Sequence, residues 1–235
     1  VERVVDAGAD GFLTEALPHL ERYYRHLAAL RDPDADGLIS IVSQFESGLD
    51  FSPLYDEVVA RSAEDFSVTA EGVGSEQVPR DDSNLAMQAA RTLAAYSGVT
   101  SGAGLHIRKE IPVAAGMAGG SADAAGALVA CDALWGTGLG RPELAILAAR
   151  VGSDVPFALM GGTALGTVRG ERLTPAMVGG VFHWVLAMSD QGLAALSVYA
   201  KLDELRSNRT IPAPGVAPDV LAALRAADAR ALGRL

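Results

Sequence analysis

The chain has 235 residues, a formal net charge of −10 and 49% hydrophobic residues. This length suffices for one or two domains with a sizeable core, and no apolar run is long enough to span a bilayer. The acidic balance, without clusters of lysine and arginine, excludes a typical nucleic-acid-binding surface. The single cysteine, Cys131, excludes an internal disulfide and a cysteine metal cluster. We expect an enzyme domain of the reducing cytoplasm, since no basic and apolar leader opens the chain.

The first half of the chain predicts two helices and two strands. Leucines at helical spacing indicate an amphipathic helix over residues 10–30, interrupted at Pro18. Alternation from Phe66 predicts a strand, and a helix that opens at residues 81–83 follows it. A second strand, through residues 105–109, leads into a glycine-rich segment.

The second half of the chain predicts mostly helices, with β structure between them. We expect, in order, a helix over Ser121–Trp135, a helix over Pro142–Arg150, a β-rich stretch over Phe157–Thr167, a strand over Phe182–Met188, a helix over Val198–Arg206, a connector over Ile211–Pro218 and a helix over Val220–Leu232. The sequence shows no internal repeat.

The run I-P-V-A-A-G-M-A-G-G-S-A-D-A-A, residues 111–125, has the composition of a phosphate-binding loop. Glycine lets backbone amides approach an anion, and the helix that follows adds free N–H groups and the positive end of its dipole. Ser121 lies where this helix is expected to begin, so its hydroxyl can cap the helix or touch a phosphate-bound metal. The alternative is a glycine-rich turn that binds nothing, because short motifs occur by chance.

Three segments carry a resemblance: I-P-V-A-A-G-M-A-G-G-S-A-D-A-A-G-A-L-V-A from Ile111, L-W-G from Leu134, and G-S-D-V-P-F-A-L-M-G-G-T-A-L-G-T from Gly152. They resemble the GHMP superfamily of small-molecule kinases, and within it the 4-diphosphocytidyl-2-C-methylerythritol kinases. The resemblance implies an α+β, GHMP-kinase-like two-domain fold with a mixed, mainly antiparallel sheet. It also implies ATP as co-substrate with Mg²⁺. The acceptor that it implies is a cytidine-diphosphate-linked methylerythritol, phosphorylated on its 2-hydroxyl in non-mevalonate isoprenoid synthesis.

The same resemblance assigns roles to single positions. It places the ATP phosphates on a loop made of Pro112, Val113, Ala114, Ala115, Gly116, Met117, Ala118, Gly119, Gly120, Ser121 and Ala122. It implies that Asn84, Leu85 and Lys109 border the adenine and that Ser121 is available to Mg²⁺. Ordinary alternatives are a helix cap for Asn84, a core position for Leu85 and a solvated strand residue for Lys109. Asp123 either assists the metal site or complements the positive end of the helix.

The aspartate of G-S-D-V-P-F, Asp154, is the residue that the resemblance identifies as catalytic. Phosphoryl transfer needs mainly positioning and charge stabilisation from the protein. In the family this aspartate orients the substrate hydroxyl and accepts its proton. Taken without the resemblance, an aspartate after Gly-Ser is more simply the cap of the next turn.

The resemblance begins at about residue 54 and departs from the family pattern at three places. The opening P-x-K-[IVL]-N-L segment, which carries an active-site lysine, and the closing G-S-G-P-[ST] motif are both missing from the sequence. By analogy with other electrostatic groups, loss of that lysine costs roughly 10²–10³ in rate. Val168 replaces a glycine of the family, which is expected to stiffen or misshape a turn. We therefore expect a truncated ATP-binding domain over residues 54–180 and a partial second domain over residues 181–235.

Residues 1–53, expected to be a mainly helical segment, resemble another family. The motif E-S-G-L-D-F-S-P is similar to one in (α/α)-toroid glycoside hydrolases related to mannosylglycerate hydrolases. The resemblance implies a general acid at Asp50 with Glu46 as its neighbour, but the required second carboxylate has no counterpart here. An EF-hand-like opening is formed by Asp32, Asp34 and Asp36, yet the position of the bidentate glutamate is Ser43. A turn rich in aspartate and glycine explains these residues equally well.

Three functions stay open at this point. The first is an ATP-dependent kinase acting on a small molecule, without a nucleic-acid or membrane partner. The second is an inactive nucleotide-binding remnant of such a kinase, and the third is a glycosidase fragment that carries Asp50. The sequence does not predict an oligomeric state.

Overall fold

The computed structural model describes residues 55–113, 116–182, 195–206 and 218–234, together with the backbone of a strand at Leu38–Val42. The predicted helix over residues 10–30, the aspartate-rich turn and Asp50 lie outside the described residues. Within them, no helix has both the length and the apolar character needed to cross a bilayer.

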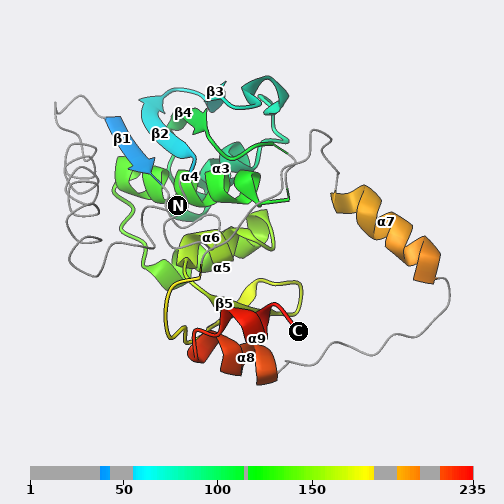
Figure 1. Cartoon of the computed structure of the whole chain (residues 1–235). Coiled ribbons are helices and arrows are strands. Elements are labelled where there is room, and N and C mark those ends of the chain that lie inside the picture. Colours follow the sequence, from blue (N-terminus) through cyan, green and yellow to red (C-terminus); the bar gives the residue numbers. More distant parts are fainter. Residues whose placement is uncertain (1–37, 43–54, 114–115, 183–194, 207–217, 235) are drawn as a thin grey trace, which may run out of the picture.

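A four-stranded mixed sheet forms the centre of the fold (Figure 1). Its strands are β1 (Leu38–Val42), β2 (Glu57–Ala63), β3 (Ser67–Gly72) and β4 (Gly102–Lys109), in the order β1-β2-β4-β3. The β1–β2 and β2–β4 pairs are antiparallel, and β3–β4 is parallel. The expected mixed, mainly antiparallel sheet is therefore present. The crossover helix α3 (Leu85–Ser97) joins the parallel pair, as parallel strands require.

Two of these strands were predicted and two were not. Alternation at residues 66–70 and 105–109 correctly indicated β3 and β4. Strand β2 was missed, although Val58 and Ala60 alternate on its buried face. Strand β1 lies inside the segment for which we expected mainly helices.

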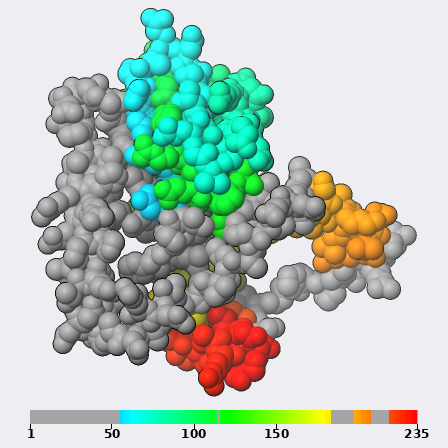
Figure 2. Space-filling view, turned by 45° about the horizontal axis from the view of Figure 1, so that its top comes forward, coloured from blue at the N-terminus to red at the C-terminus, as the bar shows by residue number. Residues whose placement is uncertain are grey.

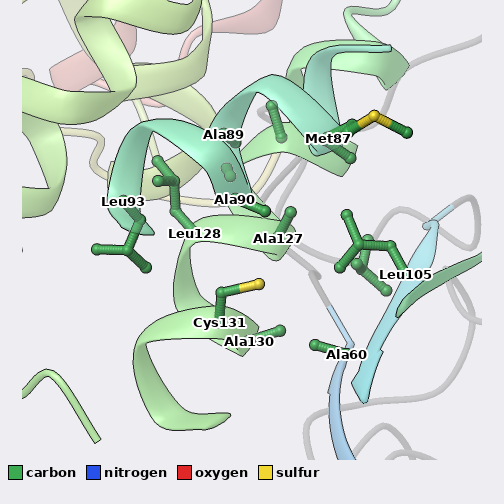
Figure 3. Packing of buried hydrophobic residues seen from close by; sticks show 14 of the residues in the cluster. Ala60, Met87, Ala89, Ala90, Leu93, Leu105, Ala127, Leu128, Ala130 and Cys131 are labelled. Atoms are coloured by element: carbon green, nitrogen blue, oxygen red, sulfur yellow. The ribbon is translucent and has the colours of Figure 1, made fainter. Parts of the chain in front are cut away.

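Two alanine-rich helices cover one face of the sheet. Figure 3 shows α3 beside α4 (Gly119–Trp135), with Ala90 close to Ala127 and Leu128. The other side of α4 packs toward Ala60 of β2 in the same view. Small side chains let the helix axes approach closely, so the core reaches high density without large residues. Helices α5 (Arg141–Val151) and α6 (Val155–Met160) pack behind α4.

Local capping explains where α3 begins and ends. The Asn84 carboxamide oxygen accepts hydrogen bonds from the N–H groups of Ala86 (2.9 Å) and Met87 (3.2 Å). Gly98 ends the helix in the left-handed conformation, with φ of 69°. The helix was predicted to open at residues 81–83, but these form a turn in which Asp81 accepts the N–H of Ser83. The start is therefore later than predicted.

The remaining elements are a short 3₁₀ turn and the C-terminal segments. The turn covers Ser75–Gln77, and the others are β5 (Ala164–Thr167), β6 (Arg172–Pro175), α7 (Ala195–Arg206), α8 (Pro218–Arg225) and α9 (Ala229–Leu232). Figure 2 shows α8 and α9 at the opposite end of the view from strands β2 to β4. The helices predicted near residues 121–135, 142–150 and 198–206 are all present.

Two predictions in this half were wrong in part. The stretch over Phe157–Thr167 was expected to be β-rich, but its first residues belong to helix α6. Short apolar runs such as V-P-F-A-L-M fit a buried strand or a helix equally, and periodicity cannot separate them. The single helix expected over Val220–Leu232 is two helices, because Ala227 adopts a positive φ and Asp228 caps a new start. The strand expected over Phe182–Met188 falls almost entirely outside the described residues.

Val168, which stands where the family pattern has glycine, adopts a strained backbone conformation. It lies in the turn between β5 and β6 with φ of 66°, and 74% of it is exposed. A β-branched residue in the left-handed region is a genuine outlier, and glycine adopts that region at no steric cost. We predict that Val168→Gly raises the free energy of unfolding by about 0.5–1 kcal/mol, after the entropic cost of glycine is subtracted. Urea unfolding monitored by circular dichroism measures this change.

A matched valine provides the control for this experiment. Val178 is also exposed, but its φ is not positive. The Val178→Gly variant is expected to lose stability, because glycine then adds only unfolded-state entropy. If Val168→Gly destabilises the protein as much as Val178→Gly, the turn is not strained.

The single thiol is a second probe of the fold. Cys131 lies on α4 in the centre of the core and is fully buried (Figure 3). Burial raises the pKa of its thiol to about 12, which suppresses the reactive thiolate. We predict that a thiol-specific reagent leaves the native protein unlabelled at pH 8 and reacts at once in denaturant. Rapid labelling under native conditions would show that α4 is not packed as described.

Candidate functional site

The glycine-rich segment connects the end of β4 to the start of α4. Helix α4 begins at Gly119, with Ala118 as the N-cap residue in the left-handed conformation (φ 54°). No side chain caps this helix start, so N–H groups of its first turn are available to an anion. Gly116 also has a positive φ, of 75°, with no atom within 4 Å of the place a Cβ would take. The backbone here leaves room for a ligand to approach closely.

Ser121 does not cap α4, although the sequence predicted that its hydroxyl could do so. It is the third residue of α4, and its N–H donates to the Ala118 carbonyl at 2.9 Å. The helix starts two residues earlier than predicted because Ala118 makes the cap through its backbone.

A hollow of about 600 Å³ lies beside this loop. The predicted site residues that line it are Asn84, Leu85, Lys109, Pro112, Val113, Gly116, Met117, Ala118, Gly119, Gly120 and Asp154. Ser121 and Ala122 are not among its lining residues, and Ala114 and Ala115 lie outside the described residues. Four regions that are distant in the sequence, 84–85, 109, 112–120 and 154, therefore surround one space.

Asp154 lies at the boundary between this hollow and a smaller one of about 320 Å³. The two hollows share Asp154 and the loop residues Gly116, Met117 and Ala118. The smaller one extends toward Phe157 of α6 and the β5–β6 hairpin. A group bound in either hollow could therefore reach the same carboxylate.

The carboxylate of Asp154 is not used as a structural cap. Asp154 is the N-cap residue of α6, but its side chain accepts no bond from the helix. Only its backbone carbonyl accepts the N–H of Ala158, at 3.1 Å. The side chain is exposed and accepts one bond from the Ser153 hydroxyl at 3.3 Å. The carboxylate is thus free to meet a ligand.

Asn84 is a structural residue that also borders the hollow. Besides capping α3, it donates from its amide nitrogen to the Pro79 carbonyl at 2.8 Å, and 5% of it is exposed. Its helix-cap alternative is therefore confirmed. Leu85 is half-buried and also lines the hollow; its Cδ1 atom lies 3.7 Å from the Cβ position built on Gly120.

Lys109 is not the solvated strand residue considered as an alternative. It is 2% exposed, and its ammonium donates to Asp56 and to Asp123, the latter at 2.8 Å. Asp56 is fully buried and also accepts the N–H groups of Glu110 (2.7 Å) and Ile111 (2.9 Å). Sequence reasoning missed this arrangement. The available signal was alternation, which places Lys109 on the same buried face of β4 as Leu105 and Ile107.

One ammonium here faces two carboxylates, which perturbs their protonation. The pKa of Asp123 is raised to about 7, mainly by burial and also by the neighbouring Asp56, against the opposing effect of Lys109. Burial would lower the pKa of Lys109, but the two carboxylates together raise it. The Oδ1 atom of Asp123 is buried without a hydrogen-bond partner. No group of three or more histidine, cysteine, aspartate or glutamate residues forms a metal cluster in the part of the chain that the structure describes.

Comparison with known proteins agrees with this geometry. Residues 84–162 match the model of the GHMP kinases N terminal domain. The 4-diphosphocytidyl-2-C-methyl-D-erythritol kinase of Streptomyces avermitilis is 54% identical over 179 residues, covering 76% of this chain and 60% of that protein. The kinase of the same name from Leifsonia xyli is 54% identical over 190 residues, covering 77% of this chain and 62% of that protein. The chain thus spans about 60% of the length of these relatives.

A solved structure shows the same fold at lower identity. The homoserine kinase of Cytophaga hutchinsonii superposes with a TM-score of 0.56 at 17% identity, covering 85% of this chain and 71% of that one. The match of residues 84–162 includes the N-cap of α3, the glycine-rich loop and Asp154, which are the parts that surround the hollow. Residues 84–162 are therefore a GHMP kinase N-terminal domain.

Proposed function

We propose that this chain binds ATP on its glycine-rich loop and transfers the terminal phosphoryl group to the 2-hydroxyl of 4-diphosphocytidyl-2-C-methyl-D-erythritol. The observation that carries the proposal is the position of Asp154, whose free carboxylate borders the same hollow as the uncapped start of α4. The choice of acceptor follows the names of the relatives at 54% identity. The acidic charge and the size of the hollow favour a small-molecule partner. We place the reaction in the cytoplasm.

Each part of the site has a role in this proposal. The triphosphate lies on the amides of residues 116–120, and the base lies between Asn84, Leu85 and the aliphatic stem of Lys109. Asp154 accepts the proton of the acceptor hydroxyl as its oxygen bonds to the terminal phosphorus. The bond from that phosphorus to the bridging oxygen breaks, and ADP leaves with the electron pair.

Mg²⁺ would supply charge neutralisation on the phosphates when bound. The Ser121 hydroxyl is the ligand that we propose for it, on the first turn of α4. Hydroxyl and phosphate oxygens are ligands that suit this hard cation.

A second function, nucleotide binding without transfer, is favoured by one observation. Among the described residues, Lys109 is the only lysine that lines the hollow, and two buried carboxylates already bind its ammonium. A lysine free to stabilise the developing charge is thus not seen in the lining. No feature of the described residues favours the glycosidase hypothesis, whose Asp50 lies outside them.

The decisive variant is Asp154→Asn. We predict that it lowers phosphoryl transfer by a factor on the order of 10²–10⁴, because the amide cannot accept the proton. The affinity for a nonhydrolysable ATP analogue stays within about twofold of that of the unmodified chain, since the Asp154 carboxylate forms no attractive contact with the phosphates. Coupled detection of ADP release measures the first quantity and isothermal titration calorimetry the second.

The control is Asp219→Asn, a change of the same kind in the first turn of α8. It should leave both transfer and binding unchanged. Retained turnover in Asp154→Asn would remove Asp154 from the mechanism. Analogue binding without any ADP release from the unmodified chain would select the binding-only function.

A further inference from the structure

The buried ammonium of Lys109 lies beneath the glycine-rich loop. Lys109 is the last residue of β4, directly before the loop, and α4 begins directly after the loop. A Cβ built on Gly119 would lie 3.3 Å from the Lys109 Nζ and 3.0 Å from the Cγ2 of Ile111. The two ends of the loop therefore meet over this lysine, with no space between them for a larger residue.

On the entry side, Asp56 fixes the loop. Its Oδ1 accepts the N–H groups of Glu110 and Ile111, the first two residues after β4. Its Oδ2 accepts from Lys109. One fully buried carboxylate thus connects the start of β2, the end of β4 and the entry to the loop.

On the exit side, Asp123 connects α4 to the same ammonium. Its Oδ2 accepts from Lys109 at 2.8 Å, and its position is one helical turn beyond Gly119. This is the side-chain bond that joins the first turns of α4 to β4 through charged groups. The exit of the loop is therefore held relative to its entry by Lys109.

Stability alone does not explain this arrangement. A buried ion pair is often no more stabilising than apolar residues of the same volume, because removing charges from water is costly. Here two carboxylates share one ammonium, and one oxygen of Asp123 has no partner. Two negative groups facing one positive group are costly to bury, but their hydrogen bonds to Lys109 fix how the groups are oriented. Such an arrangement is better suited to specifying geometry than to stabilising the fold.

We propose that Asp123 is a positioning residue, which holds the first turn of α4 against Lys109 so that the loop amides converge on a triphosphate. Asp123 also borders the hollow, but its side chain is buried against Lys109, so its action is placed in Lys109 and the loop rather than in contact with the reacting atoms. The expected effect on nucleotide affinity rests on the proposed function. The positioning of the first turn of α4 does not, and it can be measured without any ligand.

The experiment compares Asp123→Ala and Asp123→Asn with the unmodified chain by amide hydrogen exchange. In Asp123→Ala, Lys109 keeps one counter-ion, Asp56, so the buried charges balance and the variant should fold with an unchanged or higher thermal midpoint. The amides of Ser121 and Ala122, bonded to Ala118, should exchange roughly tenfold faster. Asp123→Asn retains an oxygen for Lys109 and should restore slow exchange.

Asp132→Ala is the matched control on the same helix. Asp132 accepts the N–H of Leu139 at 3.0 Å near the other end of α4, so its loss should speed exchange there and not at Ser121. Calorimetry then measures a nonhydrolysable ATP analogue and inorganic tripolyphosphate. We expect both to bind Asp123→Ala about tenfold more weakly, with the thermal midpoint retained.

Unchanged exchange at Ser121 and Ala122 in Asp123→Ala would overturn the positioning role. Faster exchange everywhere, including α5, together with a lower thermal midpoint would also overturn it, since Asp123 would then be a general stabiliser. If the unmodified chain binds no ATP analogue, the proposed function fails, and the exchange rates still decide the role of Asp123.

Discussion

The shared ammonium of Lys109 is the interaction on which the site depends. It lies at the point where the sheet, the entry of the loop and helix α4 meet, and its two carboxylate partners come from residues 53 and 14 positions away in the sequence. The apolar core around Ala60, Leu105 and Ala127 brings the sheet and helix together without specifying how far one slides along the other. A directional ionic contact supplies that missing specification.

The proposed chemistry depends on how the fold surrounds one space. The capped start of α3, the uncapped start of α4 and the turn before α6 all meet at the hollow, and each contributes a different property. Asn84 uses its side chain to satisfy α3, whereas Ala118 leaves the amides of α4 unsatisfied by any side chain. Asp154 begins α6 through its backbone only, so its carboxylate stays available. Differences in capping thus distinguish the start of α3, which a side chain satisfies, from the starts of α4 and α6, which leave polar groups available to a ligand.

Much of the fold could be predicted from the sequence, because its elements have strong local signals. Alternation indicated β3 and β4, and the helical pattern of the sequence indicated α4 and α5. Helix α6 was taken for β structure, because an apolar run of six residues has no decisive period. The Lys109 contacts could not be assigned, since pairing to Asp56 depends on the antiparallel register of β2 and β4. The left-handed Val168 was foreseeable only where a family pattern offered a glycine for comparison.

The central claim is that the loop amides hold a triphosphate whose outermost phosphate faces Asp154. A crystal structure of the chain with a nonhydrolysable ATP analogue tests it most directly. We expect the phosphates on the amides of residues 116–120 and the terminal phosphate adjacent to the Asp154 carboxylate, with the smaller hollow open beyond it. An analogue bound elsewhere, or a terminal phosphate directed away from Asp154, would contradict the claim.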